Sequence, residues 1–244
     1  MKISLINAGK RFNRDWIFRN FQQEFSAGIA YAITGPNGSG KSTLLQVIGG
    51  AMIMSEGSAK YTIGNCETAN PDESGQAEKR ESSIPDAHNQ QSAFARASAD
   101  KEIHVDQAFR YISIAAPYLE LIEEMTLQEF LQFHSQFKPF MPGFGIPQII
   151  DEIGLKTATH KQIRFYSSGM KQRVKLAQAI FSNVPCVLLD EPCTNLDAAG
   201  IELYHHLVKS YCNKRLVIVS SNDEQEYKFC TEVISILDYK KKQP

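Results

Sequence analysis

A glycine-rich segment between residues 35 and 43 constrains this chain more than any other part of its sequence. It fills each fixed position of the pattern G-x-x-x-x-G-K-[ST] and consists of Gly35, Pro36, Asn37, Gly38, Ser39, Gly40, Lys41, Ser42 and Thr43. The mostly apolar residues 29–34 before it have the length of a buried strand, and the apolar residues within 44–48 have helical spacing. The sequence therefore predicts a strand that leads into a helix through a glycine-rich loop.

Such a loop is suited to holding phosphate groups. Gly35, Gly38 and Gly40 allow backbone conformations that a β-carbon hinders, so several N–H groups can point at one anion together with the start of the helix. Lys41 adds a positive charge for the β- and γ-phosphates, and Ser42 offers a hydroxyl to the Mg²⁺ that accompanies them. The alternative, an ordinary turn with a chance lysine, does not account for the strand and the helix on its two sides.

The composition sets the scale and excludes several classes of protein. The 244 residues are 43% hydrophobic, which is enough for the core of one large α/β domain. The net charge of −1 shows no basic excess, so nucleic acid is not expected as a partner. The five cysteines are scattered without C-x-x-C spacing, which indicates reduced thiols in the cytosol rather than a disulfide framework or a zinc site. No apolar run approaches the ~20 residues of a spanning helix, so we expect a soluble chain.

Three regions around these motifs differ in character. Short apolar pieces within residues 2–34 predict β hairpins, and Phe12 among them is either core filling or a ligand contact. Large apolar residues become scarce between about 65 and 106, which predicts a polar, mostly disordered surface insertion, with a partner-binding arm as the alternative. Helical patterns from about 123 to 182, with a capping box at Thr126, predict a helical subdomain.

Two further segments carry chemistry. The buried-strand pattern that begins at Cys186 ends in Asp190 and Glu191, and ligands of doubly wound sheets bind at the carboxyl ends of strands. We therefore expect both carboxylates beside the phosphate loop, with Asp190 holding the metal through its water shell and Glu191 orienting an attacking water. The second segment precedes a helix that has one apolar face, and alone it predicts either an ordinary N-cap or a phosphate-capping site. It consists of Ser167, Ser168 and Gly169.

The order of these motifs resembles the ATP-binding subunit of the ABC transporter family, over nearly all of the chain except the insertion. Residues 35–43 look like its Walker A motif, residues 186–191 like Walker B, residues 167–170 like the signature and residues 195–197 like the D-loop. Phe12 falls where such proteins stack the adenine, so the resemblance favours stacking over core filling. It implies one α/β domain over residues 1–244: a P-loop NTPase core with a mixed or parallel sheet, an N-terminal antiparallel β part and the helical subdomain.

The resemblance also implies a function. ATP with Mg²⁺ is bound between the loop of one subunit and Ser167–Gly169 of a second copy or a homologous subunit, and its hydrolysis to ADP and phosphate powers a separate transmembrane permease. The chain would then lie at the cytoplasmic face of a membrane through that permease. Two alternatives stay open: a soluble ABC ATPase that acts as an assembly or regulatory factor, and a slow nucleotide-dependent switch.

Three departures from the family pattern bear on this function. The signature has Tyr166, Ser168 and Met170 where the family has leucine, glycine and glutamine, a variant that resembles export-type systems. The loop at 113–117 has no glutamine for Mg²⁺. The switch position, usually histidine, is Asn222, whose amide can donate to a γ-phosphate but carries no charge. We therefore expect either a slow ATPase or a site built around asparagine.

Overall fold

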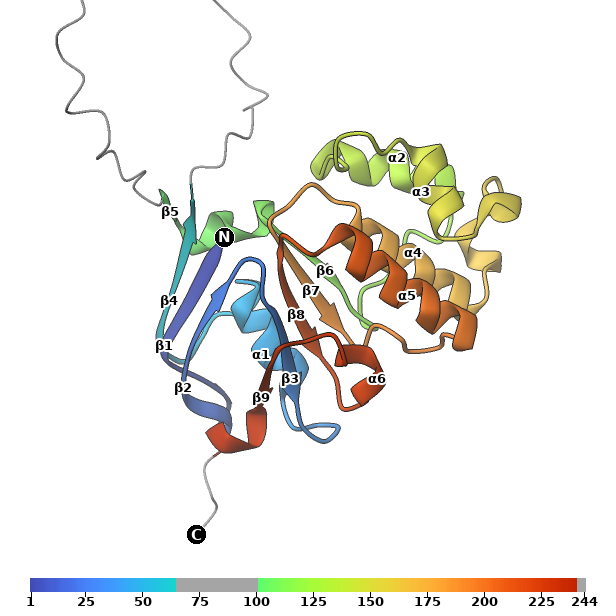
Figure 1. Ribbon diagram of the computed structural model, residues 1–244. Helices are drawn as coiled ribbons and strands as arrows, with labels where there is room; N and C mark the ends of the chain where they lie inside the picture. Colours follow the sequence, from blue (N-terminus) through green and yellow to red (C-terminus); the bar gives the residue numbers. More distant parts are fainter. Residues whose placement is uncertain (65–100, 241–244) are drawn as a thin grey trace, which may run out of the picture.

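The computed structural model describes residues 1–64 and 101–240, and its N-terminal part is a four-stranded antiparallel sheet. The strands lie in the order β2-β1-β4-β5, with bounds β1 Lys2–Phe12, β2 Asp15–Ser26, β4 Glu56–Ile63 and β5 Lys101–Ile103. β1 and β2 form the predicted hairpin, in which Phe12 pairs with Asp15 across the turn. This sheet lies at the left of Figure 1.

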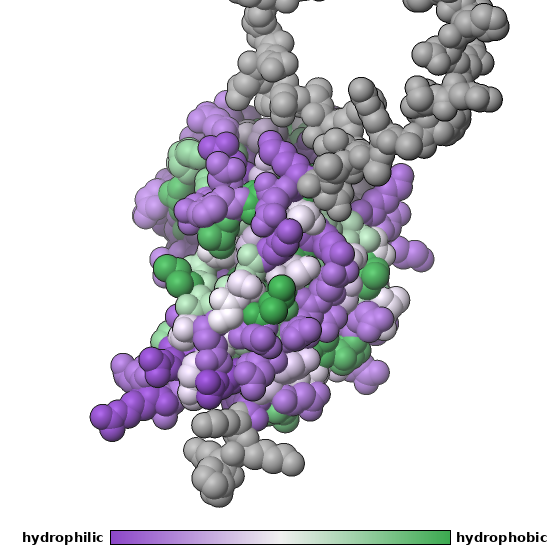
Figure 2. All heavy atoms as spheres, turned by 90° about the vertical axis from the view of Figure 1, so that its left-hand side faces the viewer, coloured by the Kyte–Doolittle hydropathy of each residue, from purple (hydrophilic) through white to green (hydrophobic). Residues whose placement is uncertain are grey.

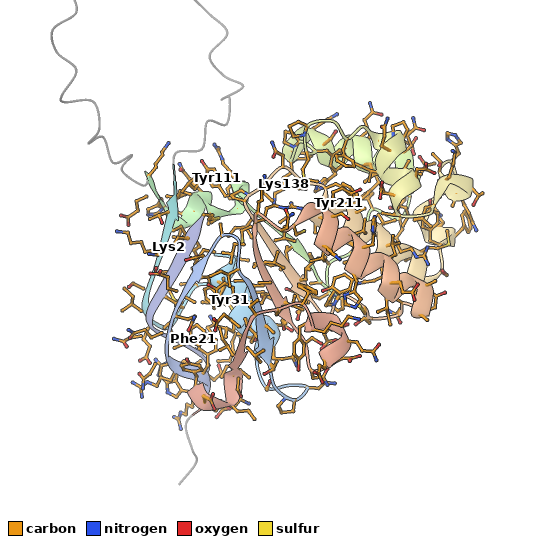
Figure 3. The ribbon with its side chains drawn as sticks, in the orientation of Figure 1. Lys2, Phe21, Tyr31, Tyr111, Lys138 and Tyr211 are labelled. Carbon is orange, nitrogen blue, oxygen red and sulfur yellow. The ribbon has the colours of Figure 1, made fainter. Side chains whose placement is uncertain are left out.

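A slip in the pairing lets three phenylalanines of β2 face the same core. Phe18 and Phe21 are three residues apart, a spacing that places side chains on opposite faces of a regular strand. Asn20 between them has φ 56, and the register of β1 against β2 shifts between Leu5 and Lys10. Phe18, Phe21 and Phe25 are consequently all fully buried. Phe25 packs edge-on against Tyr31 of β3, with 4.9 Å between the ring centroids; Figure 3 labels Phe21 and Tyr31.

The second sheet has five strands, all parallel, in the order β6-β7-β8-β3-β9. Their bounds are β3 Ala30–Thr34, β6 Ile112–Ala115, β7 Cys186–Asp190, β8 Leu216–Ser220 and β9 Glu232–Ser235. Every residue of β7 and β8 is buried, because helices or the first sheet cover both faces. The predicted α/β fold class is present, with this sheet parallel throughout.

Alternate residues of the central strands pack into two cores. Cys186 and Leu188 of β7 face α1 and the antiparallel sheet, whereas Val187 and Leu189 face the longer helices. Figure 1 shows α1 between the two sheets, α4 and α5 on the other side of the parallel sheet, and α2 and α3 farther out. The helices are α1 Lys41–Ile48, α2 Leu127–Phe137, α3 Ile146–Glu152, α4 Ser168–Ile180, α5 Ala198–Tyr211 and α6 Glu224–Tyr227, with short 3-10 turns η1 Val105–Arg110, η2 Lys156–Ala158, η3 Ile163–Phe165 and η4 Ile236–Tyr239.

Local signals place the helices between β6 and β7. The capping box at Thr126 is formed: its hydroxyl accepts from the Glu129 N–H at 3.3 Å, and the Glu129 carboxylate accepts from the Thr126 N–H at 2.8 Å. Lys138, a partly buried residue just after α2, donates from its ammonium to the carbonyl of Ile112 at the start of β6 (Figure 3). Burial lowers the pKa of Lys138. The lysine thus ties α2 to the edge of the parallel sheet.

Two predicted boundaries need correction. Residues 65–100 of the expected insertion lie outside the described residues, but residues 101–106, assigned to the same insertion, form β5 and the start of η1. One apolar side chain anchors this piece: Ile103 is buried opposite Tyr61 of β4, although the composition around it is polar. The strand predicted over residues 109–114 begins only at Ile112, because Phe109 is exposed on the turn η1 instead of being part of the sheet.

The outer face of the antiparallel sheet is mostly hydrophilic, with isolated apolar side chains rather than a continuous patch (Figure 2). Among the residues that the structure describes, no helix combines the length and the apolarity needed to cross a membrane.

Candidate functional site

The glycine-rich loop joins the carboxyl end of β3 to the start of α1, as predicted. Gly40, the N-cap of α1, has φ 102, and a β-carbon there would lie 2.2 Å from Cγ2 of Ile17. Gly35 and Gly38 also have positive φ. α1 has neither a side-chain cap nor an acidic residue in its first turn, so neither the N-cap nor the helix itself supplies an anion for its first N–H groups and its positive dipole end. This geometry suits a bound phosphate.

Lys41 is buried inside this loop. Only 4% of the residue is exposed, and its ammonium donates to the carbonyl of Gly35 at 3.0 Å and to that of Pro36 at 3.4 Å. Carbonyls compensate a buried charge only partly, and no carboxylate is within ion-pair distance of Lys41 among residues 1–64 and 101–240. An anionic group over the loop would complete this pairing.

Asp190 is the last residue of β7, two strands away from β3 and the loop that follows it. It pairs with Ser220 of β8, and Ser220 pairs with Ile33 of β3, so the three residues form one row at the carboxyl ends of the strands. β7 and β3 are therefore separated by β8, a distance of about 10 Å between backbones. Burial raises the pKa of Asp190, whereas the hydroxyls of Ser42 and Ser220 and the charge of Lys41 act in the opposite direction.

Three buried oxygens around the loop have no hydrogen-bond partner among the described residues. They are Ser39 Oγ, Asp190 Oδ1 and Ser220 Oγ. A buried unpaired polar atom costs about 1–3 kcal/mol, so three in one place indicate a ligand that pairs with them. Hydroxyl and carboxylate oxygens are the ligands that Mg²⁺ prefers, and Asp190 with Ser42 fits that ion.

Glu191 follows Asp190 with an unusual backbone. Its φ is +43, an uncommon conformation for a residue with a β-carbon, while its N–H donates to the Ser220 carbonyl at 2.8 Å. Such strain persists only where neighbouring contacts hold it, and it is found most often at functional sites. The structure thus directs the Glu191 side chain away from the regular path of β7.

Two buried side chains that sequence reasoning missed hold the loop after Glu191. The carboxylate of Glu226, on α6, accepts from the N–H of Cys193 at 2.7 Å, and the amide of Gln172, on α4, donates to the Pro192 carbonyl at 2.7 Å. Glu226 is 5% exposed and Gln172 3%. Burial raises the pKa of Glu226, which the Ser221 hydroxyl and the Cys193 N–H partly offset. No local signal marks Glu226, because the segment Glu224–Tyr227 has the composition of a surface turn.

The segment 167–170 forms the N-terminus of α4. Ser167 is its N-cap and accepts from the Met170 N–H at 3.3 Å. A β-carbon on Gly169 would lie 2.9 Å from the carbonyl of Asn195, so glycine allows the close approach of the two segments. A hollow of about 430 Å³ lies over this contact and includes Ser167, Ser168, Gly169 and Asp197 but none of residues 35–43. In one copy of the chain, the glycine-rich loop and the start of α4 therefore do not share this hollow.

The remaining predicted residues each have their own surroundings. Phe12 is 47% exposed with the Lys10 ammonium 5.1 Å from its ring centroid, so it does not fill the core. Asn222 is exposed at the exit of β8, beside Ser221, whose N–H donates to the Ile33 carbonyl at 3.1 Å. Ser113 is buried in β6, where its hydroxyl donates to the Ala179 carbonyl at 2.7 Å.

The family model for ABC transporters matches residues 18–194, a span that contains the phosphate loop, the helix start at Ser167 and both carboxylates. The chain belongs to the ABC transporter family. The resemblance predicted from the four motifs is therefore confirmed.

Relatives and solved structures agree with this family. The chain is 27% identical to the cytochrome c biogenesis ATP-binding export protein CcmA of Agrobacterium fabrum, over 92% of this chain and 90% of the relative. It is 23% identical to the lantibiotic transport ATP-binding protein SrtF of Streptococcus pyogenes, over 90% and 79%. A putative ABC transporter ATP-binding protein from Pyrococcus furiosus has a TM-score of 0.71 at 16% identity, covering 99% and 100%. The dimeric cassette MJ0796 has a TM-score of 0.69 at 21% identity, covering 96% and 93%.

We expect Lys41→Ala to weaken ATP binding at least tenfold, because it removes the buried ammonium that charge-assisted contacts to phosphate need. Calorimetric titration with ATP measures the change, and circular dichroism checks that the fold is retained. Lys156→Ala, at an exposed lysine on η2, is the matched control. Equal ATP affinity of Lys41→Ala and the parent would refute the assignment of this loop.

We expect Glu226→Ala to lower the ATPase turnover about tenfold while the ATP affinity changes less than twofold, because the Cys193 N–H loses its partner and the Glu191 loop loses one of its holds. Glu226→Gln, whose amide oxygen can still accept, should restore most of the rate. The control is Glu224→Ala, an exposed acid of the same short helix. A loss of ATP affinity equal to the loss of rate would instead indicate a general structural role for Glu226.

Proposed function

We propose that this chain is the ATP-binding and ATP-hydrolysing subunit of an ABC transport system, and that it powers export by a separate membrane permease. The observation that carries the proposal is the division of the phosphate-binding residues between two places: the loop with Lys41, Ser42 and Asp190, and the hollow at Ser167–Gly169. The names of the two relatives, both ATP-binding proteins of export or transport systems, support it further. They favour a transport subunit over a soluble assembly or regulatory factor.

The residues of the phosphate loop and of the strand end beside it have different roles. The N–H groups at the start of α1 and the Lys41 ammonium bind the β- and γ-phosphates of ATP. Ser42 and Asp190 would hold Mg²⁺, which neutralises charge on the phosphates. Glu191 orients the attacking water and accepts its proton, a role that its position one residue beyond Asp190 permits. Phe12, exposed at the end of β1, offers a ring on which an adenine base can stack.

A second copy of the chain, or a homologous subunit, would complete the site. The hollow at Ser167–Gly169 lies at the N-terminus of α4, where free N–H groups and a positive dipole end suit the γ-phosphate of an ATP bound to the partner. Head-to-tail pairing gives two such composite sites. The solved dimer of the MJ0796 cassette, with the same fold, supports this arrangement.

The described surface of the chain contains a polar groove to which a permease would bind. The groove of about 430 Å³ runs between the loop after β6 and α4, and it presents Glu120, Glu123, Lys171 and Lys175. Lys175 also donates to the Pro117 carbonyl at 2.8 Å, so the loop and the helix would move together when a partner docks. Contact through this groove would place the chain at the cytoplasmic face of a membrane.

We expect Glu191→Gln to form a stable dimer when ATP is added, because the variant keeps the shape of the side chain but lacks the carboxylate that activates water. Light scattering should show the monomer mass without nucleotide and twice that mass with ATP. Glu202→Gln, an exposed acid on α5, is the control and should stay monomeric. A monomer of Glu191→Gln at saturating ATP would contradict pairing of the isolated subunits.

We expect Asn222→His to increase phosphate release at saturating ATP up to about a hundredfold, because a group aimed at the developing charge contributes ~3 kcal/mol and a neutral amide supplies only part of it. The ATP affinity should change little. Asn213→His, at an exposed asparagine after α5, controls for the added imidazole. An unchanged or lower rate would mean that the site is built around asparagine.

A further inference from the structure

A second cavity lies at the opposite end of the parallel strands from the phosphate loop. It has a volume of about 360 Å³ and is bounded by α5, by the starts of β3 and β8, and by the segment after α6. Figure 1 shows this segment passing across the parallel sheet on the side of α5. The Thr231 N–H donates to the Ala30 carbonyl at 2.9 Å and closes one side. None of the residues assigned to ATP lines it.

The lining combines an apolar floor with positive charge. Ile29, Val208, Val217 and Phe229 supply its apolar surface. The basic residues that line the same cavity are His205, Lys209, Arg215 and Lys228. No carboxylate lines it, and among the described residues none of the three Lys and Arg side chains forms an ion pair.

Two buried nitrogens in this lining have no partner. Five buried side-chain atoms in the described part of the chain are unpaired; three surround the phosphate loop, and the other two are His205 Nε2 and Arg215 Nε. The Arg215 guanidinium is held in place, because its Nη atoms donate to the carbonyls of Ile180 and Tyr211 at 2.6 Å and of Ser182 at 3.1 Å. The guanidinium is thus a fixed positive charge at the cavity, with its Nε covered by protein.

The local field is positive as well. Burial and the charge of Lys228 lower the pKa of His205, which the carbonyl of Gln225 partly offsets. A positive field next to an apolar cavity surface complements an anion that carries an apolar body.

We propose that this cavity binds a small free organic anion, a carboxylate or sulfonate on an apolar or aromatic body. The anionic group would lie in the positive field of Arg215, Lys209 and Lys228, and the body would cover Val208, Val217 and Phe229. The volume lies within the range of small-molecule pockets, about 300–1,000 Å³, and it is too small for a folded partner.

The test compares two probes of one shape, 2-naphthoate and its neutral analogue 2-naphthamide, by calorimetric titration of the full chain. We expect saturable binding of one 2-naphthoate per chain and an affinity for 2-naphthamide about tenfold lower, since the two share one aromatic body and a similar shape but the amide carries no charge. Equal affinities, or no saturable binding of 2-naphthoate, would overturn the proposal.

Substitutions in the cavity lining test whether 2-naphthoate binds there. Lys209→Gln with Lys228→Gln, both exposed, should weaken 2-naphthoate about tenfold, whereas Lys156→Gln with Lys161→Gln on the distant helical layer should not. Val208→Trp should fill the cavity and abolish binding, and unchanged ATP affinity shows that each variant is folded. If Val208→Trp does not fold, the exposed lysine pair decides alone. Equal effects of the two lysine pairs on 2-naphthoate binding would overturn the proposal. Binding of the chain to phosphatidylglycerol vesicles without binding of 2-naphthoate would also overturn it, because that result assigns the positive charges to a lipid surface.

Discussion

The chemistry of this chain depends on one row of residues across three parallel strands. Ile33, Ser220 and Asp190 lie side by side, so the phosphate loop after β3, the exit of β8 and the carboxylate that ends β7 meet at one edge of the sheet. The row is rigid because β7 and β8 are buried along their whole length and both faces of the sheet are packed. That packing holds the buried Asp190 and Lys41, together with the hydroxyls of Ser39 and Ser220 that have no partner among the described residues, where a nucleotide and its metal would compensate them.

The loop after this row connects the parts of the site that one chain keeps apart. Gln172 reaches it from the helix that begins at the signature, and Glu226 reaches it from the segment that follows Asn222. Glu191 lies at the start of the loop with a strained φ. The start of α4 and the segment after Asn222 are therefore both tied by hydrogen bonds to the loop that follows Glu191, the residue that we propose orients water. Under the proposed function, this connection would be a physical route from the pairing of two subunits to hydrolysis.

Local patterns predicted much of the fold and only part of the site. The phosphate loop, the strand ending in Asp190 and the capping box at Thr126 each depend on neighbouring residues, so their sequences suffice. The register slip that buries Phe18 together with Phe21 was not predictable, because it depends on pairing with β1. Glu226 and β5 were missed for a related reason: one buried carboxylate and one buried isoleucine, in segments of polar composition, acquire their roles from partners far away in the chain.

The sequence by itself determined which chemistry this chain can support: a glycine-rich loop with its lysine, two carboxylates at a strand end and a serine-glycine helix start, in the order of the ABC transporter family. The tertiary structure alone decided how these groups are distributed. It placed β8 between the loop and Asp190, separated Ser167–Gly169 from the loop, and left a basic, apolar-floored cavity at the far end of the strands. The physical reason is that strand order, register and cavity lining arise from long-range packing, which no short stretch of sequence specifies.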